Sequence, residues 1–298
     1  MGLFSKKSPC PICGGKISWL LPTKIEDEYI CSECSNKIDM EDGIRSGLTM
    51  QGLREYLNFY EENWALRVGF VVSEKLDFGF FDTKLIFDLE HSLFCLSGKP
   101  DKTVFEGRAL KSFRITEDSA PLLEGSAQGL VRHSSTVPER VTAMGPQIQM
   151  LAATKRMADQ AARMHSDDTR PSYRPPMDIP EPFKAFNVEL KFDHPYWTTF
   201  RCDMSAPTFN NDFPDIENYL GEYQRDVEVM ERLASLLMQV AFPGAGESNA
   251  APSGCQSASS APSAECTAND IIKFKSLLDA GVITQEEFDA KKRQLLGI

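Results

Sequence analysis

The spacing of apolar and polar residues predicts strands in the middle of the chain and helices before and after them. Residues 186–192 (FNVELKF) alternate between apolar and polar positions, as a half-buried strand does, and residues 196–202 follow after a short turn. Apolar residues recur at helical spacing in residues 47–63, where Thr49 is a suitable N-cap, and in residues 215–242. Four further short runs have the composition of strands: residues 68–72, 84–89, 92–96 and 110–115.

These elements predict an α+β middle domain over residues 47–242 of a multidomain chain. Short antiparallel strands followed by one long helix resemble a PH-like barrel, in which the helix closes an open end. A generic antiparallel sheet with a covering helix explains the same order of elements nearly as well. Between the two sets of strands, about residues 117–182 predict a helical and Pro-rich insertion.

Within this insertion, residues 138–164 predict a helix that is interrupted at Gly145-Pro146. Met150, Met157 and Met164 recur every seven residues along it. A stripe with this period is what packing demands, so we favour a helix packed on its own domain or on a second copy. The alternative is an adaptable groove or a partner helix, because Met side chains accommodate varied surfaces.

The carboxyl-terminal part of the chain predicts a linker followed by a small helical hairpin. Residues 243–268 are rich in Ser, Ala, Pro and Gly and almost uncharged, which is typical of a flexible linker. Cys255 and Cys266 lie in this linker and are expected to be free thiols. Residues 269–298 predict two helices that are separated at Gly281.

Charge and hydropathy limit the expected location of the protein and the kinds of partner that it could bind. The chain has 298 residues, with 32 Lys and Arg against 43 Asp and Glu, a net charge of -11. Phosphates repel such a chain, so nucleic acid is an unlikely partner. The first residues lack the apolar core of a signal peptide, and no apolar run approaches the ~18–20 residues that span a bilayer. We therefore expect a cytoplasmic protein with no membrane span.

No pattern typical of a catalytic site is present. The sequence contains no nucleophile elbow, phosphate-binding loop or dinucleotide fingerprint. Its four histidines are isolated in sequence and are expected to be solvated: His91, His133, His165 and His194. We therefore expect a protein that is not an enzyme and that has no small-molecule substrate.

Two Cys-x-x-Cys pairs near the amino end predict a metal site. The four cysteines are Cys10, Cys13, Cys31 and Cys34, and 17 residues lie between Cys13 and Cys31. This spacing is typical of a zinc ribbon over residues 1–42, with hairpin strands at residues 16–21 and 28–31. Four protein ligands leave no position for water or substrate, so we expect one structural Zn²⁺. A redox dithiol is the alternative, although that motif normally occurs once and begins a helix.

Two segments resemble known families. The tail FKSLLDAGVITQEEFDAKKRQLLG resembles a SHOCT (short C-terminal) domain, which implies a small interaction or oligomerisation element. The opening, with CPICGGK and YICSEC, is similar to an N-terminal zinc-ribbon family of bacterial proteins whose function is unassigned. That resemblance implies zinc ligation by the four cysteines and implies no activity.

The sequence therefore favours a cytoplasmic protein-binding or scaffold protein. Its partner would be another protein, or a second copy that associates through the hairpin at residues 269–298. The alternative is a ribbon protein associated with nucleic acid or transcription. Residues 1–40 contain five lysines and five acidic residues, so they lack the basic face that contacts with phosphates require.

Overall fold

The computed structural model describes residues 9–18, 22–78, 83–165, 179–210 and 213–249. The chain divides into two units, Met1–Pro252 and Ser253–Ile298, and every described residue belongs to the first. The predicted hairpin at residues 269–298, Cys255 and Cys266 therefore lie outside the described residues. The predicted domain boundaries stay a prediction.

The amino-terminal part of the described chain contains a small hairpin and four helices. They are β1 (Thr23–Ile25), β2 (Glu28–Ile30), α1 (Ser32–Asn36), α2 (Asp42–Ser46), α3 (Met50–Glu62) and α4 (Trp64–Gly69). The predicted helix at residues 47–63 is α3. Its predicted N-cap is confirmed, because the Thr49 side chain accepts a hydrogen bond from the N–H of Gly52.

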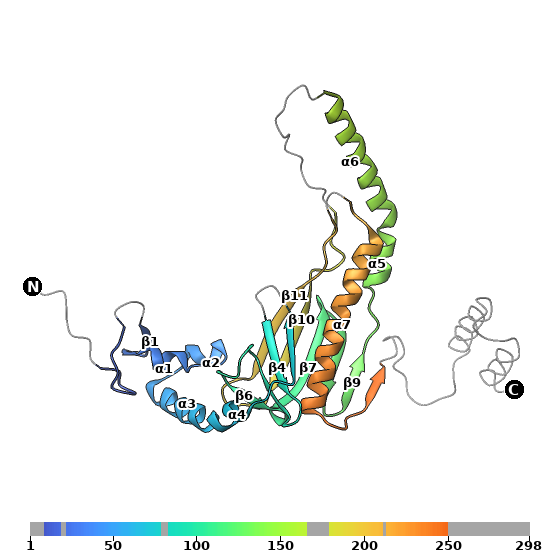
Figure 1. The fold of residues 1–298 in the computed structure, drawn as a ribbon. Helices are drawn as coiled ribbons and strands as arrows, with labels where there is room; N and C mark the ends of the chain where they lie inside the picture. Colours follow the sequence, from blue (N-terminus) through green and yellow to red (C-terminus); the bar gives the residue numbers. More distant parts are fainter. Residues whose placement is uncertain (1–8, 19–21, 79–82, 166–178, 211–212, 250–298) are drawn as a thin grey trace, which may run out of the picture. The chain divides into compact units, whose positions relative to one another are not determined.

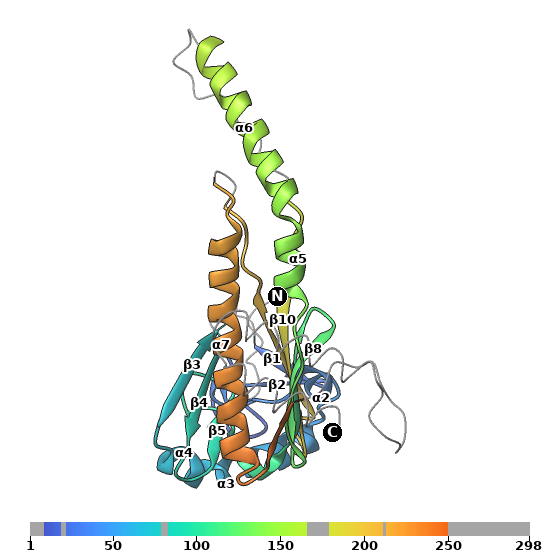
Figure 2. The same cartoon turned by 90° about the vertical axis from the view of Figure 1, so that its right-hand side faces the viewer.

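Two sheets follow, and both are built almost entirely from antiparallel pairs. The first has the order β3 (Glu74–Phe78), β4 (Thr83–Asp88), β5 (Leu93–Cys95) and β6 (Val104–Glu106). The second has the order β11 (Thr199–Ser205), β10 (Ala185–Phe192), β7 (Leu110–Glu117), β8 (Ala120–Ser126), β9 (Gly129–Arg132) and β12 (Glu247–Asn249), where β12 runs parallel to β9. The helix α7 (Ile216–Ala241) contacts β4 of the first sheet and β8 and β9 of the second. Figure 2 shows α7 between the two sets of strands.

One apolar core joins both sheets to α7. In β10 the predicted alternation is confirmed, because Phe186, Val188, Leu190 and Phe192 are all buried in this core. The rings of Phe94 in β5 and Phe105 in β6 lie within 6.2 Å and 5.1 Å of Phe192. The mixed α+β architecture, with antiparallel sheets and one long helix, is therefore as predicted, while the PH-like comparison stays a prediction.

The predicted strand at residues 68–72 is wrong. Val68 lies in the last turn of α4, and Val71 and Val72 follow it without pairing to a described strand. The N–H of Val71 instead donates a hydrogen bond of 2.8 Å to the buried carboxylate of Asp88. Three valines in five residues have strand composition, but a side chain takes the hydrogen bond that a neighbouring strand would need.

The predicted insertion at residues 117–182 is wrong in its first part, because β8 and β9 belong to the second sheet. Their composition hides them: β8 contains Pro121 and Gly125, which are typical of turns. Pro121 lies at an irregularity in the pairing with β7, and a side chain at Gly125 would meet the ring of Phe113. After β9 come the predicted helices, α5 (Val137–Ala143) and α6 (Gly145–His165), with the predicted break between them.

The methionine stripe of α6 does not pack on the described domain. Ile148 is buried, but the side chains of Met150 and Met157 are 65% and 71% exposed. The prediction that this stripe packs on its own domain is wrong for these two residues, and the side chain of Met164 lies outside the description. Figures 1 and 2 both show α6 continuing beyond α5, away from the sheets.

None of the helices in the described ranges is long and apolar enough to cross a lipid bilayer.

Candidate metal centre

The first Cys-x-x-Cys pair lies in a tight turn. The N–H of Gly14 donates to the carbonyl of Cys10, and the N–H of Cys10 donates to the carbonyl of Gly15, both over 2.8 Å. Gly14 has a φ of 71°, a conformation that glycine adopts without strain. The turn brings the N–H of Gly15 to 3.4 Å from the Sγ atom of Cys13, where it can stabilise a thiolate.

The second pair lies at the beginning of a helix. Cys31 is the N-cap of α1, and Cys34 lies within α1. The N–H of Cys31 points across to the first pair and donates to the Sγ atom of Cys10 over 3.4 Å. Both sulfurs of the first pair therefore accept a backbone N–H, and the second pair supplies one of these two donors.

The predicted hairpin is confirmed in its second strand only. β2 lies within the predicted range 28–31, whereas β1 begins at Thr23 rather than in residues 16–21, of which residues 19–21 lie outside the described part. A tight turn at Glu26, with a φ of 50°, connects β1 and β2 and sets which residues pair. The apolar run ISWLL suggests a strand, but the pairing is set by where this turn falls.

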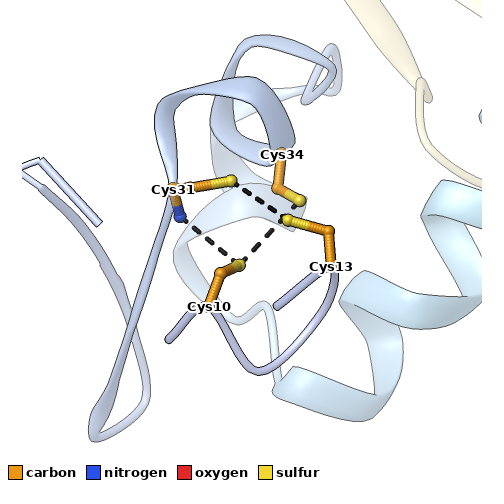
Figure 3. A group of neighbouring side chains, drawn as sticks. All are labelled: Cys10, Cys13, Cys31 and Cys34. Atoms are coloured by element: carbon orange, nitrogen blue, oxygen red, sulfur yellow. Dashed lines mark hydrogen bonds between the residues drawn. The ribbon is translucent and has the colours of Figure 1, made fainter. Parts of the chain in front are cut away.

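The four cysteine sulfurs converge on one point (Figure 3). All four Sγ atoms lie within 4.8 Å of one another, and three of the four residues are buried. The Cys10 and Cys34 sulfurs are 4.0 Å apart, and the Cys13 and Cys31 sulfurs are 3.4 Å apart. A tetrahedron with zinc–sulfur bonds of about 2.3 Å has edges of about 3.8 Å, so these positions fit one tetrahedral ion.

Burial and backbone hydrogen bonds act in opposite directions on these thiols. Burial alone raises the pKa of Cys10, but N–H groups from Cys13, Cys31 and Ile12 lower it to about 6. Burial raises the pKa of Cys31 and of Cys34, and an ion that binds their sulfurs as thiolates would displace their protons. The cluster can hold one metal ion, and the donor set of four sulfurs suits a soft or borderline ion such as zinc.

The apolar core of the cysteine cluster extends into α3. Leu53 and Tyr56 of α3 are fully buried in the same cluster as Cys10, Cys31 and Cys34. The hydroxyl of Tyr56 donates to a backbone carbonyl, that of Lys37, and accepts from the N–H of Asp39. We call residues 9–56 the cysteine module, because α3 completes a core that the ribbon alone is too short to form.

Two acidic residues connect the cysteine module to the sheets. The Asp39 carboxylate accepts the N–H of Thr103 over 2.8 Å, and its carbonyl accepts the indole N–H of Trp197 over 3.1 Å. The carboxylate of Glu41 accepts the N–H groups of Thr198 and Thr199 and the Thr198 hydroxyl. No spacing or composition singles out these contacts in the sequence, because they join segments that are 64 to 158 residues apart.

Replacing Glu41 by Ala is expected to loosen this connection without releasing metal. Hydrogen bonds from the Thr198 hydroxyl and from the N–H groups of Thr198 and Thr199 hold the pKa of the Glu41 carboxyl below its ordinary value. Its stabilising effect is therefore complete above that ordinary pKa and is lost as the pH falls through the lowered one. Hydrogen exchange should show faster exchange of the Thr198 and Thr199 amides in the variant.

The control for this experiment is Glu33→Ala, which removes an exposed carboxylate from α1. Metal content should be unchanged in both variants, and only Glu41→Ala should accelerate the two amides. Equal exchange in both variants would show that Glu41 does not hold the cysteine module against β11.

The histidines are not simply solvated, which corrects the expectation for three of them. His91 lies 2.9 Å from the carboxylate of the buried Asp88, and His133 lies 3.0 Å from that of Glu124. His194 is half-buried with its ring centre 5.1 Å from that of Phe59, and burial lowers its pKa. The side chain of His165 lies outside the description. Among the described residues, the four cysteines are the only group of three or more metal-ligating side chains close enough to share an ion.

Comparison with known proteins gives one family match near each end of the chain. Residues 9–56 match a family model described as a domain of unknown function (DUF4428), and residues 271–296 match the Short C-terminal domain (SHOCT). The first match covers the cysteine module and ends within α3. Searches of the curated proteins and of the solved structures give no match. The chain thus carries a DUF4428 domain with its four clustered cysteines at the amino end and a SHOCT domain at the carboxyl end.

Proposed function

We propose that this protein is a non-enzymatic binding or scaffold protein whose amino-terminal module is stabilised by one Zn²⁺. The observation that carries the proposal is the convergence of four cysteine sulfurs within 4.8 Å. Four thiolates complete the coordination of zinc, so the ion would have no free position at which to activate water or bind a substrate. Its role would be to fold the cysteine module.

The contacts of the module also suit a structural role. Asp39 and Glu41 fix the module to Thr103 and Thr198 at the ends of strands, rather than lining a cavity beside the sulfurs. The buried Tyr56 joins α3 to the segment that carries these two acids. The metal would therefore hold a rigid surface in a fixed place on the sheets.

We further propose that the SHOCT tail is the part that captures a partner or a second copy. About thirty residues bury too little apolar surface to be stable alone, so such a hairpin gains stability by docking. Within the predicted linker at residues 243–268, Glu247–Asn249 form β12 on the second sheet, which corrects the first part of that prediction. Residues 250–268 are rich in Ser, Ala and Pro, and we expect a segment of this composition to allow the tail to reach a neighbouring protein.

Deleting residues 269–298 is expected to lower the mass of the assembly or to abolish partner capture. The measurement combines light scattering of the purified protein with affinity capture from its own cells, using the full chain and the deletion in parallel. Bound metal should be the same in both, since the cysteine module is untouched. Identical mass and identical captured proteins for the two chains would contradict the role of the tail.

A further inference from the structure

The strand β11 is the edge of the second sheet in the described part of the chain. Among the described strands it pairs only with β10, and Figure 1 shows it at the end of the sheet. The N–H of Phe192 donates to the carbonyl of Thr198, and the N–H of Ala206 donates to the carbonyl of Lys184. Backbone N–H and C=O groups alternate in direction along a strand, so the even-numbered residues of β11 direct their backbone groups to β10. The odd-numbered residues direct their backbone N–H and C=O groups to the open edge of the sheet.

The sequence of β11 is complementary to itself when it is read in the opposite direction. The strand reads TFRCDMS, with Cys202 at its centre. Positions equidistant from Cys202 carry opposite charges in Arg201 and Asp203 and apolar side chains in Phe200 and Met204. The two outermost positions, Thr199 and Ser205, both carry hydroxyl groups. An antiparallel copy of this strand would therefore place opposite charges and apolar side chains opposite each other on either side of Cys202.

Burial alternates along β11, but the side chains that face the core are only partly covered. Phe200, Cys202 and Met204 pack against the main core, yet each is only partly buried. Arg201 and Asp203 are exposed on the opposite face of the sheet. A neighbouring strand with the same alternation would extend the core on one face and the charged surface on the other.

We propose that two copies of this chain associate through β11, antiparallel about a two-fold axis that passes beside Cys202. The pairing joins the two second sheets into one continuous sheet. It is independent of the SHOCT tail and does not rest on the function proposed for that tail. The occupant is a second copy rather than an unrelated peptide, because the charge pattern of the strand is complemented by the strand itself.

The hydrogen-bond directions in the single chain are those that this axis requires. Arg201 and Asp203 direct their backbone groups to the open edge, so each Arg201 forms a hydrogen-bonded pair with the second copy's Asp203. Glu41 already accepts the N–H of Thr199, which confines the new ladder to the central part of the strand. Cys202 then faces the second copy's Cys202 in a non-hydrogen-bonded pair.

The side-chain charges fit the same arrangement. Arg201 forms an ion pair of 2.7 Å with Glu189 on the neighbouring strand and is still 71% exposed. Asp203 forms no ion pair within the described residues. The second copy's Arg201 would lie opposite Asp203 and supply the cation that this carboxylate lacks, while Glu189 continues to orient the guanidinium.

A disulfide between the two Cys202 residues tests the axis directly. Opposed residues in a non-hydrogen-bonded pair have Cα atoms about 4.5 Å apart, within the range of about 4.4–6.8 Å for disulfides. The full chain, with Cys255 and Cys266 replaced by Ser, is treated with diamide and separated on a non-reducing gel. We expect a cross-linked dimer that disappears when Cys202 is also replaced by Ser. No dimer, or an equal amount without Cys202, would overturn the proposal.

Charge variants test the pairing of Arg201 with Asp203 in the same full-length background. Asp203→Arg gives a strand with two arginines, and Arg201→Asp gives a strand with two aspartates. Each variant alone should lose at least tenfold of the cross-linked dimer. Mixing differently tagged preparations of the two should restore a cross-linked heterodimer, because every Arg then faces an Asp.

This mixing experiment separates a β11 dimer from other forms of association. Association through the tail would leave the particle mass high but would not place the two Cys202 residues together. Circular dichroism of the two exposed-residue variants checks that both are folded. Equal cross-linking within and between the variants, or none after mixing, would overturn the assignment. Cross-linking only in the complementary mixture would support it.

Discussion

Replacing Cys34 by Ala is expected to release the metal and to unfold the cysteine module. Cys34 is buried, and its sulfur is one of four that could complete a tetrahedral site. A structural zinc ion supplies of order 10 kcal/mol of folding free energy to a small module, more than its short core can replace. The variant should therefore contain less than a tenth of the zinc of the unaltered protein, which elemental analysis measures.

Limited proteolysis should then cleave the Cys34→Ala variant within residues 9–56 while the sheets stay protected. The control is Cys202→Ser, which also removes a thiol but lies in β11, away from the cluster. It should retain one zinc per chain and the protease resistance of the cysteine module. Full zinc content in Cys34→Ala, or no zinc in the unaltered protein, would contradict a structural metal centre.

The substitution Gly107→Ala is expected to destabilise the two-sheet domain by about 2–3 kcal/mol, within the range for overpacked sites. Gly107 begins a single helical turn between β6 and β7, and a Cβ atom there would meet the carbonyl oxygen of Val240. That carbonyl belongs to the last turn of α7, so relieving the contact requires backbone movement rather than a change of rotamer. Urea unfolding followed by tryptophan fluorescence measures the loss.

Gly221→Ala is the matched control, since it makes the same chemical change at a glycine of α7. A Cβ atom at Gly221 would meet nothing within 4 Å, and alanine is favoured over glycine in a helix by about 1 kcal/mol. The control should therefore be neutral or stabilising. If both variants unfold at the same urea concentration as the unaltered protein, the close approach of Gly107 to α7 does not limit stability.

The sequence predicted those helices and strands that short stretches of residues specify by themselves. Alternation predicted β10, helical spacing predicted α7, and the predicted cap at Thr49 accepts the expected N–H group. The strand β8 was missed because Pro121 and Gly125 are typical of turns. Their positions are explained by the neighbouring strand β7, which no local pattern reveals.

The candidate metal centre was likewise predicted only in part. The spacing of the four cysteines predicted a shared site, and the structure brings all four sulfurs together. The contribution of Tyr56 and the contacts of Asp39 and Glu41 were not predicted, because they depend on which segments meet in three dimensions. The symmetry of TFRCDMS is visible in the sequence, but it acquires meaning only when β11 proves to be an edge strand.

An ion bound by the four cysteines would affect more than the cysteine module, because of where Glu41 lies. Glu41 occupies the N–H of Thr199 at the first residue of β11. A chain that lacked this ion would lose the order of the segment that carries Glu41 and would uncover a longer stretch of unpaired strand. Such exposed strands recruit other chains indiscriminately. Starvation for the ion would thus be seen first as precipitation of the protein.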